Sequence, residues 1–365
     1  MRNILRMTAR HVLDPRRPLE IRRQSVVNLW DFLVRRGIAD TSRTPSEIID
    51  TGRTLELHRY LTTRQTDGRP VLLVPPLGAQ ASCFDLRQGL SMAADFVDRG
   101  RPVYLVDYGP LKGADAKVGI EHFINDVLPR AIRKVSEDAG GQDVHLVGWC
   151  MGGLLSIGTT AVYPDLPIRT VAMVASPFDM SKNPMLKPIQ TIGKYTGGRV
   201  MGTVIKAAGS VPAPMVSLAF KATALPTYLK KPKTLWTRRE DRDFLGQIQA
   251  VDEIMNNMFA YPGRATMQLY QRMAIRNELA TGKVQGPTHL VDLADITVPV
   301  MNVAGMTDVL VPAPAAHHVG TLVPNSPDVR LPLVPGGHLG ALTGTKAPET
   351  TWTEINAFIA DHDEP

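Results

Sequence analysis

The chain has 365 residues, of which 44% are hydrophobic and 21% are charged, and its formal net charge is +6. This length accommodates one large α/β domain with an insertion, and the composition argues against wholesale disorder. Only two cysteines occur and no secretory apolar segment is present, so we expect a reducing, cytoplasmic environment. No run approaches the roughly 20 apolar residues of a membrane-spanning helix.

Positive charge is concentrated at the start of the chain. Residues 1–64 contain 13 arginines and seven acidic residues, an excess that equals the net charge of the whole chain. Within them, the segment 21–36 combines arginine pairs with apolar residues, and we expect a basic, mainly helical N-terminal arm over 1–64. Such an arm either packs on the body with its arginines solvated, or lies on an anionic surface or docks a partner. No aromatic-interleaved basic motif or zinc spacing accompanies it, so nucleic-acid binding is not expected.

From residue 70 onward, short β-branched apolar runs alternate with helical stretches. Continuous apolar strands separated by helices are typical of a mostly parallel sheet with helices on both faces. Residues 65–179 and 286–365 are therefore predicted to form one α/β core. Its predicted strands are 71–74, 103–106, 144–147, 170–174, 298–303 and 329–333, and its predicted helices are 120–135, 152–160 and 349–359.

The stretch 180–285 interrupts this alternation. It is rich in proline, methionine and lysine, and then shows helical patterns at 245–258 and 265–279. The stretch lies between the predicted strands 170–174 and 298–303. An insertion at this place suits a lid over the carboxyl ends of the sheet, where ligands bind in open α/β folds. We expect residues 180–285 to form an inserted helical cap.

An apolar strand leads into Gly148-Trp149-Cys150-Met151-Gly152, followed by a small-residue helix. Gly-x-Cys-x-Gly between a strand and a helix has the form of a nucleophile elbow, with cysteine in place of serine. The glycines have a physical reason, because larger side chains would collide where strand and helix approach each other. The helix dipole also favours a thiolate at this position. The pattern predicts Cys150 as a nucleophile, whereas Cys83 is expected to be a packed side chain.

Two further residues follow later strands in the order that this chemistry uses. Asp308 comes shortly after strand 298–303, and His338 comes shortly after strand 329–333. Nucleophile, acid and histidine in this order is the chain order of the α/β-hydrolase fold. We therefore predict a catalytic triad of Cys150, Asp308 and His338.

The loop after the first strand and the start of the elbow helix are predicted to supply the oxyanion hole. One donor is the N–H of Met151, and the other is the N–H of Leu77 or Gly78, since the two preceding prolines have none. No ligand spacing for a metal and no nucleotide-binding loop is recognisable. The site is therefore expected to work with side chains and backbone alone.

These motifs resemble those of poly(3-hydroxyalkanoate) synthases. The likeness covers roughly residues 70–360 and is carried by the Gly-Trp-Cys-Met-Gly-Gly elbow, the Gly-Met-Thr-Asp-Val-Leu-Val-Pro acid loop and the Gly-Gly-His-Leu-Gly turn. In length, the chain is most similar to the catalytic subunit of the two-subunit synthases. This similarity implies an accessory synthase subunit or a homodimer, and an arm that associates with a granule or an anionic membrane surface.

The resemblance also implies an acyltransferase. In it, Cys150 takes the acyl group of a 3-hydroxyacyl-CoA as a thioester, His338 removes the thiol proton, and Asp308 helps to activate the hydroxyl of the next acyl unit. Acyl-CoA is then the substrate, and no separate cofactor is expected. The chemistry is sensible, because a thioester exchanges with a thiolate at little cost and its carbonyl stays open to an alcohol.

Three positions depart from the family pattern. Ala79 and Ser82 stand where the family has Asn and Tyr after the first strand, and Tyr108 stands where it has Trp after the second. These positions lie near the acyl site by analogy, so acyl length and polymer formation stay open. Two other functions also remain: a cysteine-dependent thioesterase or esterase, with water as acceptor, and a non-catalytic granule- or membrane-associated protein.

Overall fold

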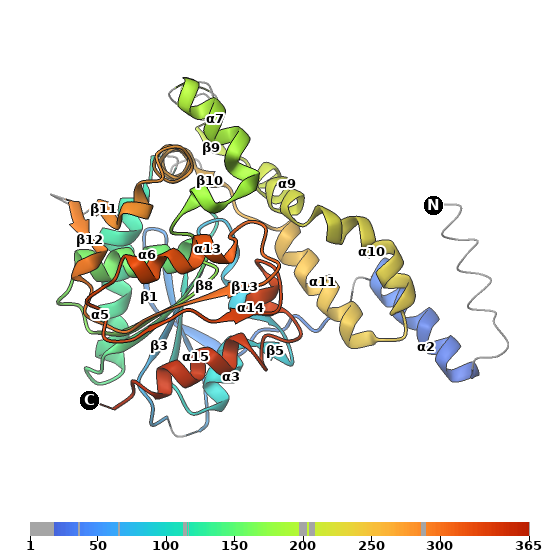
Figure 1. Cartoon of the computed structure of the whole chain (residues 1–365). Helices are drawn as coiled ribbons and strands as arrows, with labels where there is room; N and C mark the ends of the chain where they lie inside the picture. Colours follow the sequence, from blue (N-terminus) through green and yellow to red (C-terminus); the bar gives the residue numbers. More distant parts are fainter. Residues whose placement is uncertain are drawn as a thin grey trace.

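The computed structural model describes residues 18–35, 37–64, 66–111, 115, 117–196, 203, 209–285 and 290–364. Among these residues, nine strands form a central sheet in the order β1-β2-β6-β3-β7-β8-β13-β14, with β15 paired to β13 (Figure 1). The strands are β1 (Ser46–Gly52), β2 (Leu55–Tyr60), β3 (Val71–Val74), β6 (Val103–Asp107), β7 (Val144–Trp149), β8 (Ile168–Val174), β13 (Val300–Gly305), β14 (Val329–Arg330) and β15 (Leu333–Val334).

The sheet is parallel from β6 to β15 and antiparallel only where β1 and β2 join it. All four residues of β3 are buried, as are all six of β7. Strands covered on both faces read as continuous apolar runs, which is why the sequence located them. The predicted strand 329–333 is interrupted, because its middle residues belong to neither β14 nor β15. The predicted mostly parallel α/β-hydrolase fold is confirmed.

Helices cover both faces of the sheet. One face packs against α4 (Ile120–His122), the π-helical turn η4 (Phe123–Val127), α5 (Leu128–Asp138) and α6 (Met151–Val162). The other face packs against α3 (Met92–Asp98) and α15 (Thr351–Ala360). On α5, Leu128, Ile132 and Val135 recur at helical spacing and are completely buried, which fixes the face that the helix turns to the sheet.

Part of the inserted segment lies above the carboxyl ends of the strands (Figure 1). Its elements are α7 (Lys187–Thr196), β9 (Ser210–Val211), α9 (Ala213–Thr223), α10 (Leu225–Thr237), α11 (Arg242–Asn256), β10 (Tyr261–Pro262), α12 (Gly263–Gln268), η7 (Leu269–Ile275), η8 (Glu278–Thr281) and β11 (Lys283–Gln285). The helices α9, α10 and α11 extend sideways from the sheet. The division of the chain into arm, core and cap stays a prediction.

Short elements connect the larger ones, most of them in the core and two of them, η5 and η6, at the start of the inserted segment. They are η2 (Ala81–Phe84), β4 (Asp85–Arg87), β5 (Leu90–Ser91), η5 (Met180–Lys182), η6 (Pro184–Leu186), β12 (Leu290–Asp292), η9 (Leu293–Asp295), α13 (Ala313–Ala316), η10 (His317–Thr321) and α14 (Gly340–Thr343). In the described part of the chain, no helix is long and apolar enough to cross a membrane.

The segment 1–64, predicted to be a mainly helical arm, also contains the strands β1 and β2. In β2, Leu55, Leu57 and Tyr60 are buried while Glu56 is exposed. The strand lies between β6 and the edge strand β1. Such alternation of buried and exposed residues is typical of a strand. The prediction for this segment rested on its arginine content and not on this pattern. Residues 1–17 lie outside the described residues.

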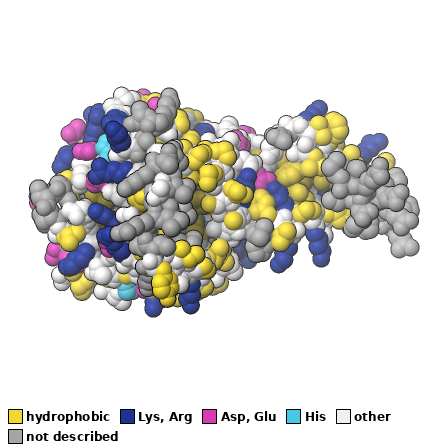
Figure 2. Space-filling model, turned by 90° about the horizontal axis from the view of Figure 1, so that it is seen from above, with side chains coloured by type: hydrophobic (Ala, Val, Ile, Leu, Met, Phe, Trp, Pro, Cys, Tyr) yellow, Lys and Arg dark blue, Asp and Glu magenta, His cyan; other side chains and the backbone are white. Residues whose placement is uncertain are grey.

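The helix α2 (Leu19–Trp30), with the turn η1 (Asp31–Arg35), lies against the sideways extension. The side-chain amide of Asn28 donates to the Arg239 carbonyl at 3.0 Å, and Arg242 bonds to Asp31 at 2.9 Å. Several apolar side chains nevertheless remain exposed on α2, among them Trp30. Figure 2 shows further hydrophobic side chains over α9 and α10, where Met215, Leu218 and Leu229 are exposed.

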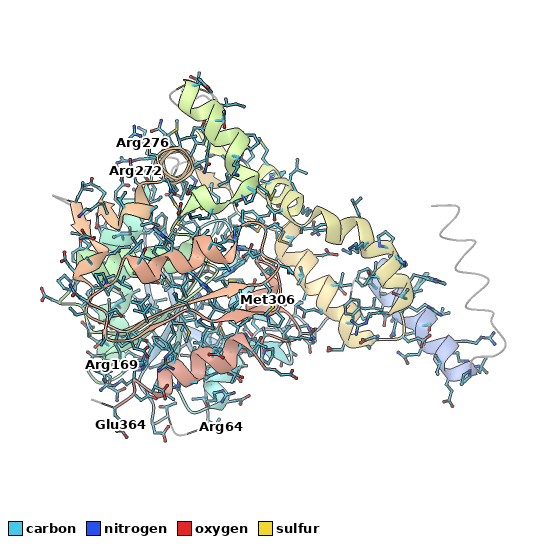
Figure 3. The ribbon with its side chains drawn as sticks, viewed as in Figure 1. Arg64, Arg169, Arg272, Arg276, Met306 and Glu364 are labelled. Carbon is cyan, nitrogen blue, oxygen red and sulfur yellow. The ribbon has the colours of Figure 1, made fainter. Side chains whose placement is uncertain are left out.

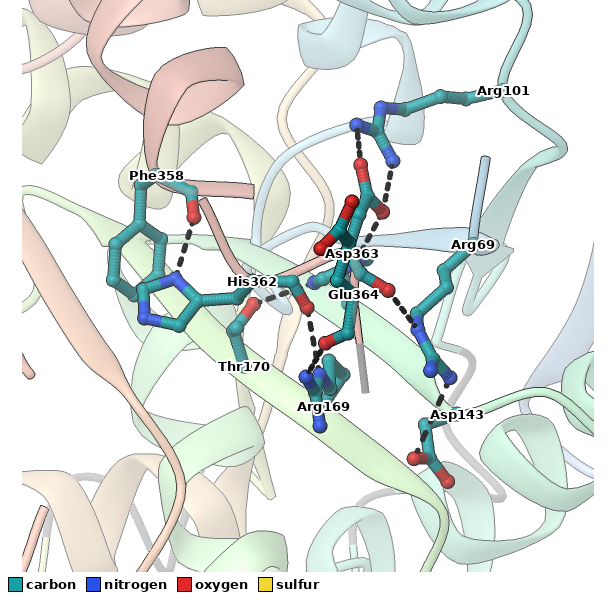
Figure 4. Close-up of polar contacts among 10 residues, drawn as sticks. Arg69, Arg101, Asp143, Arg169, Thr170, Phe358, His362, Asp363 and Glu364 are labelled. Atoms are coloured by element: carbon teal, nitrogen blue, oxygen red, sulfur yellow. Dashed lines mark hydrogen bonds and ion pairs between the residues drawn. The ribbon is translucent and has the colours of Figure 1, made fainter. Parts of the chain in front are cut away.

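At the opposite, amino end of the parallel strands, the last described residues are bound by arginines (Figure 4). The Asp363 carboxylate accepts hydrogen bonds from Arg101 and lies 3.3 Å from Nε2 of the buried His145 on β7. Arg69 donates to the Asp363 carbonyl at 2.7 Å. Burial raises the pKa of Asp363, but the hydrogen bonds from Arg101 and His145 outweigh burial and hold the pKa well below its usual range.

Candidate active site

Cys150 lies in the tight turn between β7 and α6, with φ 52° and ψ −114°. A non-glycine residue with positive φ is strained and persists only where its surroundings hold it. Two flanking glycines make the turn possible. A Cβ on Gly148 would stand 2.5 Å from the Cα of Gly153, and a Cβ on Gly152 would stand 2.0 Å from the Val74 carbonyl oxygen.

The elbow is held by the neighbouring strand. The N–H of Cys150 donates to the Val174 carbonyl at 2.8 Å, and the Ser176 hydroxyl donates to the Cys150 carbonyl at 2.8 Å. Cys150 itself is half-buried, whereas Cys83 is completely buried, and burial raises the pKa of the Cys83 thiol. Of the two sulfurs, only that of Cys150 is therefore suited to react.

Asp308 lies in the loop after β13, and both of its carboxylate oxygens accept hydrogen bonds from within the protein. Its Oδ1 accepts the N–H groups of Leu310 and Val311, both at 2.8 Å, and its Oδ2 lies 2.8 Å from Nδ1 of His338. The carboxylate side chain is 0% exposed. Because the two backbone donors fix the carboxylate plane, Oδ2 is held where it orients the imidazole ring.

His338 connects the carboxylate to the nucleophile. Its Nε2 is buried and has no hydrogen-bond partner of good geometry in the described structure. Burial lowers the pKa of His338, but the negative charge of the Cys150 thiolate and the hydrogen bond to Asp308 outweigh burial and raise it well above its ordinary value. The Trp149 ring, 5.5 Å from the imidazole between centroids, covers one side of His338. The three predicted triad residues thus meet in one place.

The predicted oxyanion-hole residues border the same place. Met151 is the first residue of α6, and Leu77 and Gly78 follow β3. No backbone carbonyl of the described residues accepts the N–H of Leu77 or Gly78. Both N–H groups therefore remain as candidates for the second donor, beside that of Met151.

Two residues of the cap, which the sequence did not indicate, contact this loop. Phe259 donates its N–H to the Gly78 carbonyl at 2.8 Å, and the Tyr261 ring covers Gly78 so closely that a Cβ there would stand 2.1 Å from a ring carbon. Burial raises the pKa of Tyr261, and the charge of Cys150 raises it further. No motif marks these residues, because their proximity arises only when the cap folds onto the core.

The three departures from the family pattern are all buried beside the oxyanion loop. Ala79, Ser82 and Tyr108 are each less than 9% exposed. The Tyr108 ring packs edge-on against Phe123 at 5.1 Å between centroids, and its buried hydroxyl has no hydrogen-bond partner in the described structure. These side chains therefore belong to the buried interior beside the loop.

A cavity of about 460 Å³ adjoins the elbow helix on the cap side. Its lining includes the apolar Met151 and Leu155, and also Arg272 on η7 and Arg276 directly after it. Figure 3 shows the two arginines close together near the top of the molecule. Both arginines form ion pairs with Glu278. In the part of the chain that the structure describes, no group of three or more His, Cys, Asp or Glu side chains is arranged to hold a metal.

Comparisons with known proteins agree with this arrangement. A family model described as alpha/beta hydrolase fold matches residues 69–345. The chain is 22% identical over 324 residues to "Poly(3-hydroxyalkanoate) polymerase subunit PhaC" of Haloferax mediterranei, covering 88% of this chain and 65% of that protein. It is 25% identical to the protein of the same name from Allochromatium vinosum, covering 88% of this chain and 89% of that protein.

Solved structures show the same fold at lower identity. A thermophilic esterase from Thermogutta terrifontis matches with a TM-score of 0.52 and 15% identity, covering 88% of this chain and all of that one. The resemblance to poly(3-hydroxyalkanoate) synthases predicted from the motifs is confirmed by the relatives. The roles of the individual site residues stay predictions.

Proposed function

Because this chain belongs to the alpha/beta hydrolase fold family, we propose that it is an acyltransferase that forms a polyester from 3-hydroxyacyl-CoA through a thioester on Cys150. The observation that supports the proposal is the hydrogen bond between Asp308 and His338, together with the strained turn that holds Cys150 after β7. The names of the relatives supply the substrate class.

In the first half-reaction, the Cys150 thiolate attacks the carbonyl carbon of the acyl-CoA. The carbonyl oxygen gains negative charge, which the N–H of Met151 and one N–H of the loop after β3 stabilise. When the carbonyl re-forms, the bond to the CoA sulfur breaks, and CoA leaves with the proton carried by His338. The raised pKa of His338 keeps that proton on the ring while the thiolate is present.

In the second half-reaction, the hydroxyl of another acyl unit attacks the thioester carbonyl. His338 takes the hydroxyl proton through Nε2, an ester bond forms, and the Cys150 sulfur leaves as a thiolate. The incoming hydroxyl does not reach Asp308, because the carboxylate side chain is 0% exposed and both of its oxygens already accept hydrogen bonds. We therefore assign Asp308 an action through His338 rather than directly on the hydroxyl.

The choice of cysteine supports transfer over simple ester hydrolysis. A thioester lies close in free energy to the acyl-CoA from which it forms and remains reactive towards an alcohol, whereas a serine ester would be the more stable intermediate. The cap covers the loop after β3 through Phe259 and Tyr261, which both contact Gly78. Covering the thioester restricts the access of water, which is the competing acceptor.

The test is incubation with 3-hydroxybutyryl-CoA and longer homologues, with CoA release and the acyl product followed together. CoA release with an ester or polymer product is the expected result. CoA release with only the free 3-hydroxy acid would establish a thioesterase instead. Absence of CoA release with every homologue, from folded protein, would leave the non-catalytic alternative.

The location and partners follow from the surface. We infer that the exposed apolar side chains on α2, α9 and α10, together with the arginines of residues 1–64, bind a granule or an anionic membrane surface. The same surface also suits an accessory synthase subunit or a second copy of the chain. Co-sedimentation with anionic vesicles, and the mass of the protein in solution with and without acyl-CoA, distinguish these partners.

A further inference from the structure

One peptide unit connects the nucleophile to the oxyanion hole. The carbonyl of Cys150 and the N–H of Met151 belong to the same planar peptide group, so fixing one fixes the other. The Ser176 hydroxyl donates to that carbonyl at 2.8 Å, and Ser176 is completely buried. The helical bond to the same carbonyl, from the N–H of Leu154, is longer, at 3.3 Å. The hydrogen bond from Ser176 is thus the shorter of the two that orient this peptide.

Ser176 is itself fixed by a buried asparagine. The side-chain amide of Asn302 on β13 donates to the Ser176 carbonyl at 2.9 Å and to the Ala316 carbonyl at 2.9 Å, and its oxygen accepts the Ser176 N–H at 3.3 Å. The preceding Ala175 has a φ of 51°, a second strained residue beside Cys150. Strain persists where surrounding contacts over-determine the backbone, and Asn302 supplies such contacts.

The space around the Ser176 hydroxyl is closed. A Cβ on Gly153 would stand 2.1 Å from this oxygen, so the helix and the hydroxyl are in direct contact. The hydroxyl therefore has little freedom to turn to another acceptor. A hydrogen bond to a peptide carbonyl also polarises the N–H at the other end of the same group and strengthens it as a donor.

We propose that Ser176 is a positioning residue of the oxyanion hole, which holds the Cys150–Met151 peptide so that the Met151 N–H points at the developing negative oxygen. Ser176 touches neither substrate nor sulfur in this role. The inference rests on the proposed function, because it assumes a tetrahedral intermediate on Cys150. It adds a residue that no motif of the chain indicates.

The test compares Ser176→Ala with Ser156→Ala. Ser156 is also completely buried, and its hydroxyl donates to the Gly152 carbonyl at 2.8 Å. The two variants lose the same kind of buried hydrogen bond at the same distance, but only Ser176 bonds to the peptide that carries the Met151 N–H. A thermal unfolding curve for each variant reports the structural cost that both share.

Three readouts separate oxyanion stabilisation from nucleophile reactivity. Release of the first equivalent of CoA from 3-hydroxybutyryl-CoA measures acylation. A short aliphatic aldehyde binds when the Cys150 sulfur adds to its carbonyl carbon, which places the carbonyl oxygen in the hole. Its affinity therefore depends on the hole and on the thiol, but not on CoA release. Alkylation of Cys150 by iodoacetamide forms no oxyanion and measures only the thiolate.

For Ser176→Ala we expect acylation to slow about 10-fold with little change in KM, less than the 10²–10³-fold loss from removing a donor outright. Aldehyde binding should weaken by a similar factor, while alkylation stays within about twofold of the wild type. Ser156→Ala should match the wild type in all three. Equal behaviour of the two variants, or a matching loss in alkylation, would overturn the assignment. If the wild type releases no CoA, the proposed function fails, and aldehyde binding still decides the role of Ser176.

Discussion

Replacing Asp308 by asparagine tests how the carboxylate acts. The introduced side chain would keep one oxygen for the N–H groups of Leu310 and Val311, which both lie 2.8 Å from the carboxylate of the wild type. Its amide nitrogen would then face Nδ1 of His338, donor against donor, unless the imidazole adopts the other tautomer. In that tautomer Nε2 carries the proton and cannot accept one.

The magnitude follows from what is lost. One charge-assisted hydrogen bond of 2.8 Å disappears from a fully buried carboxylate, and such bonds contribute about 1.5–3 kcal/mol. At 1.36 kcal/mol per factor of ten, the expected loss in rate is roughly 10- to 150-fold. A thiol needs the base less than an alcohol does, since part of it ionises unaided near neutral pH. We therefore expect the loss to fall mainly on the second half-reaction.

The assay is intact-protein mass spectrometry of Asp308→Asn after rapid mixing with 3-hydroxybutyryl-CoA. The expected result is a burst of about one equivalent of CoA, an acyl adduct on Cys150, and a steady rate lower by about 10²-fold, the lower limit of what a general base contributes. Asp328→Asn is the matched control, because Asp328 also lies near a histidine, 3.5 Å from Nε2 of His362, away from the site. Absence of any adduct would place Asp308 in the first half-reaction as well, and full activity would remove it from the site.

Three further predictions concern other parts of the molecule. Cys150→Ala should abolish CoA release while the buried Cys83→Ala retains it, and a labelled acyl group on a folded Cys150→Ala protein would contradict the assignment. The depressed pKa of Asp363 adds stability above the unfolded pKa of about 3.9 that is lost as pH falls below it, so Asp363→Asn should flatten the decline in the urea midpoint between pH 5 and pH 3; an unchanged decline would count against it. Replacing exposed Trp30 and Leu33 by Glu should reduce co-sedimentation with anionic vesicles without slowing CoA release, and unchanged binding would place the membrane contact elsewhere.

The sequence predicted what depends on local pattern. Strands such as β3 and β7 are buried on both faces, so their apolar runs stand out. Cys150 was identifiable because Gly148 and Gly152 are dictated by the tight approach of strand and helix. Asp308 and His338 were identifiable because each follows a strand end in a known order.

What the sequence did not predict depends on distant contacts. The strands β1 and β2 were hidden in an arginine-rich segment, and their pairing with β6 is visible only in the folded sheet. Tyr261 contacts Gly78, which lies far from it in the sequence, and Asn302 on β13 bonds to Ser176, which follows β8. An isolated tyrosine or asparagine carries no signal of its partner, so side-chain networks of this kind require the structure.

The attachment of the cap to the loop after β3 has a consequence for the order of events in a turnover. Phe259 and Tyr261 hold Gly78 through a hydrogen bond and a ring contact, so the cap cannot lift without releasing a residue that borders the oxyanion hole. On the proposed mechanism, any movement of the cap away from the core would therefore also disturb the loop that supplies an oxyanion donor. Bond making would then require the cap to be in place, where it also limits the access of water.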